Sequence, residues 1–91
     1  MTREDFEADL LNNIGFTKVL DGENKKFVKD GKALFGRPCR HCEVTTTKDG
    51  MNIAYTYSGF SRCNRGLSWR AMAEKTSATQ VFGEMFKYFN L

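Results

Sequence analysis

Apolar residues recur at helical spacing only near the two ends of the chain. The first set lies near the N-terminus: Phe6, Leu10, Leu11 and Ile14. It follows the stretch "TRED", which offers a capping hydroxyl and acids for a first turn, and it precedes Gly15. This pattern is typical of an amphipathic helix with a glycine stop. We expect the polar positions Glu4, Glu7 and Asp9 to form a solvated face with no catalytic role.

A second helix is predicted near the C-terminus. Residues 77–80, "SATQ", have the spacing of a capping box. The residues after it form one apolar stripe: Val81, Phe82, Met85, Phe86 and Phe89. Glu84 and Lys87 lie off that stripe. We interpret the stripe as part of the core.

Between the helices, turn signals divide the chain into short segments. Asp-Gly occurs at 21–22, 30–31 and 49–50, a break lies at 36–38, and Ser-Gly at 58–59 precedes another loop. Strands are expected at 16–20, 26–29, 42–48, 51–58 and 67–73. The order predicts an α+β fold in one compact domain over residues 1–91. In this fold an antiparallel meander sheet of four to five strands carries the N-terminal and C-terminal helices on one face.

The hairpin at Asp49-Gly50 allows a register to be predicted. A two-residue turn there pairs Lys48 with Met51 and places Val44 opposite Tyr55. One face then holds Cys42, Val44, Thr46, Ile53, Tyr55 and Tyr57. The other holds His41, Glu43, Thr45, Thr47, Asn52, Ala54 and Thr56. The first set is largely apolar, so we expect it to face the helices and the second set to remain free for docking.

Charge and composition restrict the class of protein. The formal net charge of +3 is unevenly distributed, with about −2 over residues 1–30 and about +5 over residues 31–73. No apolar run reaches the length of a membrane span, and the acidic N-terminus is unlike a signal peptide. Three cysteines form an odd set that fits reduced thiols. We therefore expect a cytoplasmic protein without membrane contact.

The stretch "CRHC" at 39–42 raises the question of a zinc site. Cys39 and Cys42 could be joined only by Cys63 and a fourth group such as His41, because a second Cys-x-x-Cys pair is missing. The predicted register also points His41 away from Cys42. We therefore prefer a strand start with Cys42 in the core, and we expect no metal and no cofactor.

The sequence does not indicate an enzyme. Arg62 and Arg65 flank Cys63 and would favour its thiolate. A nucleophile also needs a positioned base, and the only histidine is His41, which no motif places. No glycine-rich phosphate loop, metalloprotease helix or nucleophile elbow is present. We therefore expect a non-enzymatic protein in which Cys63 is a loop residue.

A basic edge is the candidate binding site. In the predicted hairpin, residues 37–41 enter the sheet at the end where residues 58–65 leave it. The candidate binding residues are Arg37, Arg40, His41, Arg62, Arg65 and Arg70. Phe60 lies in the same loop and Trp69 is expected in the next strand. Arginine and aromatic side chains together can bind phosphates, stack on bases or anchor a protein interface.

Two functions follow from this edge. In one, the protein is a small inhibitor that docks on another protein or a ribonucleoprotein complex. In the alternative, it is a small intracellular nucleic-acid-binding module, with zinc stabilising its cysteines. Co-purifying nucleic acid would favour the module, and a stoichiometric complex that survives nuclease would favour the inhibitor.

The order of the elements resembles a known class of proteins. The chain runs from "TREDFEADLLNNIG" through "TTTKDGMNIAYTYSG" to "TSATQVFGEMFKYFN". In this layout it resembles the small α+β proteins that phages encode against host defences, anti-CRISPR proteins among them. The resemblance implies a phage-type inhibitor of a nucleic-acid-handling complex in the host bacterial cytoplasm. The layout is also similar to double-stranded-RNA-binding domains, but "EKTSATQVFGEMF" lacks the paired lysines of that family.

Overall fold

Five antiparallel strands form one open sheet, as the computed structural model shows for residues 1–30, 33–34, 37–38, 41–57 and 61–86. Only the backbone is described for residues 33–34, 37–38, 57, 61–63 and 85–86. The strands, in their order across the sheet, are β1 (Thr17–Leu20), β2 (Lys25–Asp30), β5 (His41–Thr46), β6 (Gly50–Tyr57) and β7 (Ser61–Ser68). Between β2 and β5, β3 (Ala33–Leu34) and β4 (Arg37–Pro38) form a separate two-stranded sheet.

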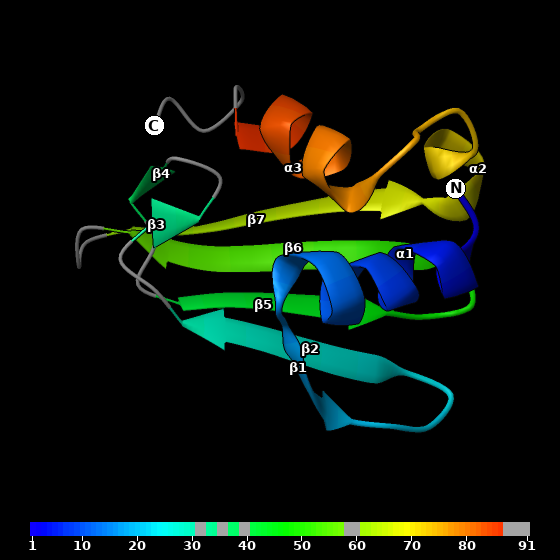
Figure 1. The fold of residues 1–91 in the computed structure, drawn as a ribbon, viewed down its shortest axis with the longest axis horizontal. Coiled ribbons are helices and arrows are strands. Elements are labelled where there is room, and N and C mark those ends of the chain that lie inside the picture. The colour runs from blue at the N-terminus through cyan, green and yellow to red at the C-terminus, as the bar shows by residue number, and fades with distance from the viewer. Residues whose placement is uncertain (31–32, 35–36, 39–40, 58–60, 87–91) are drawn as a thin grey trace.

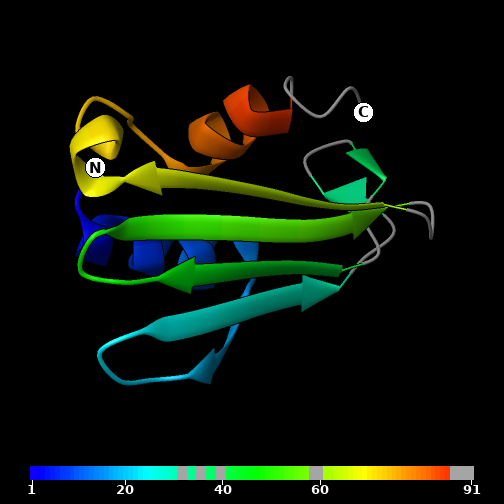
Figure 2. The ribbon, with the colours of Figure 1, turned by 180° about the vertical axis from the view of Figure 1, so that it is seen from behind.

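The helices lie on one side of this sheet. They are α1 (Arg3–Asp9), the π-helical turn η1 (Leu10–Ile14), the short α2 (Trp69–Met72) and α3 (Ala78–Phe86). Figure 1 shows α1 in front of the sheet and α3 beside β7. Seen from behind in Figure 2, no helix lies in front of the strands. The predicted α+β fold is confirmed. Within the described ranges, no helix is long and apolar enough to cross a membrane.

Local signals set the ends of the two predicted helices. The Thr2 hydroxyl accepts a hydrogen bond from Asp5 N at 3.2 Å, and η1 ends at Gly15 with a φ of 95°. This left-handed conformation favours glycine. At the start of α3, the Ser77 hydroxyl accepts from Gln80 N at 3.1 Å. Both predicted caps are confirmed.

The β5–β6 hairpin keeps the predicted faces but not the predicted pairing. Thr46 lies opposite Met51 and Val44 lies opposite Ile53, so Tyr55 faces Cys42 rather than Val44. The register has moved by two residues, and an even shift leaves each side chain on the same face. The predicted Val44–Tyr55 pair is therefore wrong, while the predicted burial of Cys42, Val44 and Tyr55 is confirmed.

Two features explain the shifted turn. The Thr47 hydroxyl accepts from Asp49 N at 3.1 Å and from Gly50 N at 3.3 Å, so Thr47 belongs to the turn rather than the strand. Gly50 begins β6 because β7 approaches closely there. A Cβ at Gly50 would lie 2.3 Å from Leu67 O. The glycine therefore serves close packing of two strands rather than a two-residue turn.

The strand predicted at 67–73 is wrong, because β7 ends at Ser68 and a helical turn follows. The Ser68 hydroxyl accepts from Ala71 N at 3.1 Å and caps α2. Trp69, expected in a strand, lies in α2 and donates from Nε1 to Thr47 O at 2.7 Å. Residues 61–65, expected in a loop, belong to β7.

One face of the sheet and the helices enclose the core. Its largest fully buried side chains include Phe6, Leu10, Phe27, Val44, Ile53, Tyr55, Met72, Val81 and Phe82. The Phe6 ring lies 6.0 Å from that of Phe82 and 5.9 Å from that of Trp69, both edge to face. These contacts join α1, α2 and α3 over the same strands.

The first helix does not have the solvated acidic face that was expected. Glu7 is 8% exposed, and its Oε2 accepts from Arg3 Nε at 3.2 Å and from the Thr46 hydroxyl. Lys25 Nζ lies 3.5 Å from Glu7 Oε1. A buried carboxylate is tolerated when partners of this kind satisfy it. The prediction was wrong for Glu7 because two of its partners, Lys25 and Thr46, lie in strands distant in sequence.

Asp9 also binds another element rather than only solvent. Its Oδ2 accepts from Ala78 N at 2.6 Å, so the carboxylate of α1 caps the first residue of α3. Of the three acids expected on a solvated face, Glu4 is the exposed one.

Candidate docking face

The face of the sheet away from the helices is called the open face. Directly paired residues share a face, so the register gives its members in three rows. One row is Val28, Glu43, Ala54 and Asn64; the next is Lys26, Thr45, Asn52 and Gly66; the third is Asp30, His41, Thr56 and Arg62. The predicted free positions Thr45, Asn52 and Thr56 lie on it, while Thr47 lies in the turn.

An uncharged and nearly flat patch covers part of β5, β6 and β7 on the open face. Thr45, Asn52, Ala54 and Asn64 occupy it, and Gly66 contributes no side chain at all. A Cβ at Gly66 would lie 3.4 Å from Met51 O and 3.5 Å from Asn52 Nδ2, which is close to ordinary contact. A shallow hollow of about 340 Å³ adjoins this glycine, with Thr45, Asn52 and Ser68 among its lining residues. The patch can therefore accept a partner's side chain while offering hydroxyl and amide groups.

A histidine held by two carboxylates marks one border of the open face. His41 Nδ1 bonds the Asp30 carboxylate across the β2–β5 pair, and Nε2 lies 3.1 Å from Glu43 Oε1. The bond to Asp30 raises the pKa of His41 most, and the bond to Glu43 adds to it. Both ring nitrogens are occupied, so the ring acts here as the centre of an ion-pair cluster.

The six residues of the predicted basic edge do not share one surface. His41 and Arg62 occupy one row of the open face, with Thr56 between them. Arg65 pairs with the buried Ile53, which puts its position on the helix-covered face, and its side chain is exposed there. Arg62 and Arg65 are three residues apart in one strand, so they lie on opposite faces.

The other arginines lie at opposite ends of the molecule. Arg37 is in β4 and Arg70 is in α2, which Figure 1 shows at the two ends of the long axis. Arg70 is exposed. Arg40, like Phe60, lies outside the described residues. The predicted edge required residues 58–65 to form a loop. Residues 61–65 belong to β7 instead, and this strand places Arg62 and Arg65 on opposite faces.

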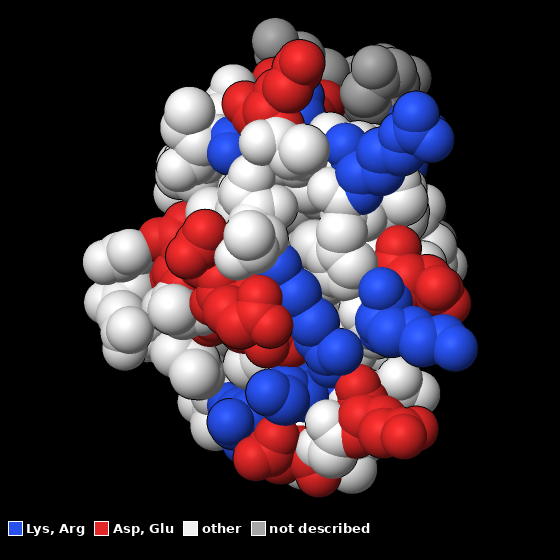
Figure 3. Space-filling model, turned by 90° about the vertical axis from the view of Figure 1, so that its right-hand side faces the viewer, with Lys and Arg blue, Asp and Glu red and all other residues white. Residues whose placement is uncertain are grey.

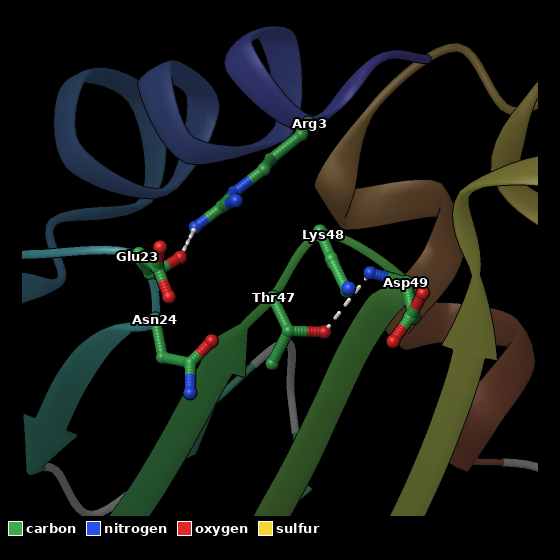
Figure 4. Close-up of a pocket in the computed structure, with 6 residues that line it drawn as sticks. All are labelled: Arg3, Glu23, Asn24, Thr47, Lys48 and Asp49. Atoms are coloured by element: carbon green, nitrogen blue, oxygen red, sulfur yellow. Dashed lines mark hydrogen bonds between the residues drawn. The ribbon is translucent and has the colours of Figure 1, made fainter.

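A cleft lies at the end of the molecule where the β5–β6 turn meets α1. It measures about 540 Å³ and is lined by Arg3, Glu23, Asn24, Thr47, Lys48 and Asp49. Figure 4 shows Arg3 reaching across from the start of α1 to Glu23, where Nη2 donates to the backbone oxygen at 2.6 Å. Arg3 also binds Glu7 and Thr46 O. Its guanidinium therefore connects α1 to the β1–β2 turn and to the end of β5. We interpret the cleft as a place where these elements are held together rather than as a binding site.

The charges at that end are mixed in sign. Figure 3 shows acidic and basic side chains side by side there, without a continuous basic area. Lys18 and Lys25 Nζ lie 3.5 and 3.8 Å from the Asp21 carboxylate. Such interspersed pairs do not concentrate the positive potential that attracts phosphates.

Of the three cysteines considered for a zinc site, the structure describes the side chain of Cys42. Cys42 is fully buried on the helix-covered face, opposite Tyr55. Cys39 lies outside the described residues, and of Cys63 only the backbone, in β7, is described. In the described part of the chain, no group of three His, Cys, Asp or Glu side chains could hold a metal ion.

Sequence reasoning missed the contacts or the strand position of three residues of the open face. Glu43 was placed on it but not linked to His41, although their spacing of two in one strand gives that neighbourhood directly. Asp30 pairs with His41 across the intervening residues 31–40, which no local pattern reveals. Gly66 was read as part of a loop. Comparisons of the chain with models of protein families, with curated proteins and with solved structures find no match.

Proposed function

We propose that this protein is a non-enzymatic binding protein that docks on another protein through its open face. The observation that carries the proposal is the uncovered sheet face with an uncharged patch over β5–β7, made by Thr45, Asn52, Ala54, Asn64 and Gly66. Charged residues lie beside this patch, where Asp30 and Glu43 hold His41. Charged residues are usually depleted at the core of a protein interface and occur at its rim.

The open face is of moderate size. Its five strands lie about 4.8 Å apart, and the eight residues of β6 rise about 3.3 Å each, so the sheet measures roughly 20 by 26 Å. A standard protein interface buries about 800 Å² on each partner. A partner that forms an interface of this size therefore also contacts the borders of the open face.

Chemistry at the open face favours a protein surface over nucleic acid as the contact. The described positions on it include no Phe, Tyr or Trp on which a base could stack. Its charges are mixed in sign, with Asp30 and Glu43 among Lys26 and His41, so the face does not concentrate the positive potential that attracts phosphates. The layout of the chain resembles that of small phage inhibitors, and this resemblance suggests the wider setting. We propose that the protein partner belongs to a nucleic-acid-handling complex of the bacterial cytoplasm, of the CRISPR type.

A pull-down from bacterial lysate tests this function. The protein is immobilised as wild type and as Thr45→Arg/Asn52→Arg, which places two long cations on the open face. A matched control, Asn12→Arg/Thr79→Arg, makes the same changes at exposed positions of η1 and α3.

The proposal expects a stoichiometric partner that the wild type and the control retain after nuclease treatment and the open-face variant loses. Loss of the partner on nuclease treatment would instead favour a nucleic-acid-binding module. Retention of the partner by all three proteins would remove the open face as the site.

A further inference from the structure

Strand β1 leaves one edge of the sheet exposed. Among the strands that the structure describes, it pairs with β2 alone, so its outer backbone N–H and C=O groups face away from the sheet. All four of its residues are exposed, and Val19 and Leu20 are 55% and 54% accessible. Among the described side chains, the exposed large apolar residues are Leu11, Val19 and Leu20. Two of these three lie in this one short strand.

Lysines flank the same edge on both faces of the sheet. Lys26 pairs with Leu20 on the open face, whereas Lys29 and Lys18 belong to the helix-covered side. Lys18 lies 3.5 Å from Asp21, but within the described residues neither Lys26 nor Lys29 forms an ion pair. The edge therefore combines exposed aliphatic side chains with cations that lack an acidic partner in the described part of the chain.

We propose that β1 accepts an extended segment of a partner protein as a sixth strand, and that this segment carries aliphatic residues flanked by acids. Backbone hydrogen bonds to β1 would hold the segment, its aliphatic side chains would cover Val19 and Leu20, and its acids would meet Lys26 and Lys29. A second copy of this chain fits less well, because it would bring the same lysines together. The inference concerns the β1 edge of the sheet, which adjoins the open face at Leu20 and Lys26, and it does not depend on the proposed function.

The geometry of β1 limits the length of this pairing. The register shifts between Lys18 and Leu20, so Val19 is an extra residue relative to β2. Such a bulge increases the local twist and shortens the flat part of an edge. The added strand is therefore short, about as long as β1 itself, and buries little area.

Nuclear magnetic resonance with a defined probe tests the inference. The probe is an eight-residue peptide with four central valines and two glutamates at each end, which places glutamates on both faces of the added strand. The control peptide replaces each glutamate with lysine. Titrating the acidic peptide into the labelled whole chain should shift the amide signals of residues 17–20 and saturate at about millimolar concentration. The basic peptide should bind at least tenfold more weakly, and raising the salt concentration should reduce the difference.

Two variants and a matched control complete the test. Val19→Glu/Leu20→Glu and Lys26→Glu/Lys29→Glu should each weaken binding of the acidic peptide at least tenfold. Leu11→Lys changes the third exposed apolar residue and should leave the binding unchanged. Melting curves confirm that each protein is folded.

The inference is overturned if the acidic peptide does not bind, if both peptides bind equally, or if the shifts fall on other strands. Sedimentation of the protein alone provides one more outcome. A dimer that Val19→Lys dissociates would assign the edge to a second copy and would likewise overturn the proposal.

Discussion

The two faces of the same sheet differ in what their side chains do. On the helix-covered face, Phe27, Val44 and Ile53 are fully buried. On the open face, their strand neighbours Val28, Thr45 and Asn52 remain partly or largely exposed. Alternation along each strand therefore divides the residues into one set that stabilises the fold and one set available for recognition. Adjacent residues should then respond very differently to substitution.

The sharpest test of this division uses two neighbouring residues in β2. Phe27→Ala removes a fully buried ring and should lower the free energy of unfolding by about 3–5 kcal/mol. Val28→Ala removes a half-buried side chain from the open face and should cost less than about 1 kcal/mol. Denaturant titration measures both values. Equal losses in the free energy of unfolding would contradict the division of roles between the two faces.

A second test concerns the acids of α1. Glu7→Gln weakens the contacts of a buried carboxylate with Arg3 and Lys25 and should cost about 2–3 kcal/mol. Glu4→Gln, in the same helix but exposed, should stay within about 0.5 kcal/mol. Thermal unfolding distinguishes the two. A stable Glu7→Gln protein would mean that the carboxylate is not needed to hold α1 on the sheet.

Two glycines provide a comparison within the β6–β7 pair. A methyl group at Gly50 would press on the backbone of β7, so Gly50→Ala should cost about 1–3 kcal/mol. Gly66→Ala points into the hollow of the open face and should change stability by less than about 0.5 kcal/mol. Both values come from chemical denaturation. A destabilised Gly66→Ala protein would show that the hollow is tightly packed rather than open.

The smallest expected effect is a pH dependence at the border of the open face. The Asp30 and Glu43 carboxylates raise the pKa of His41 above its ordinary value of 6.5. The stabilisation is therefore fully present below about pH 6.5 and is lost as the pH rises through the folded-state pKa.

Because the His41 side chain is 41% exposed, the effect should be below about 1 kcal/mol. The difference in stability between wild type and Asp30→Asn should shrink from pH 5.5 to pH 8.5. A difference that grew over this range would contradict the sign.

The sequence predicted the parts of the fold that rest on local signals. Thr2, Ser77 and Gly15 mark helix ends by chemistry that acts within a few residues. The hydrophobic alternation predicted the faces of β5 and β6 correctly, although the predicted pairing was wrong by two residues. A register shift by an even number of residues leaves each side chain on the same face. Local patterns were therefore sufficient for the architecture.

The errors arose where distant segments decide the outcome. Gly50 looked like a turn residue, but its role depends on the approach of β7. Glu7 looked solvated, but Lys25 and Thr46 reach it from the sheet. The predicted arginine edge required residues 58–65 to be a loop, and the pairing of β7 with β6 placed Arg62 and Arg65 on opposite faces.

The central claim is that recognition resides on the open face and stability on the other. The most direct measurement is the affinity of the partner, once captured, for Thr45→Arg/Asn52→Arg and for Asn12→Arg/Thr79→Arg, with unfolding curves for both. The account predicts that both variants unfold within about 1 kcal/mol of wild type. It also predicts that only the open-face variant binds at least tenfold more weakly. Equal affinity of the two folded variants for the partner would contradict it, as would a loss of affinity confined to Asn12→Arg/Thr79→Arg.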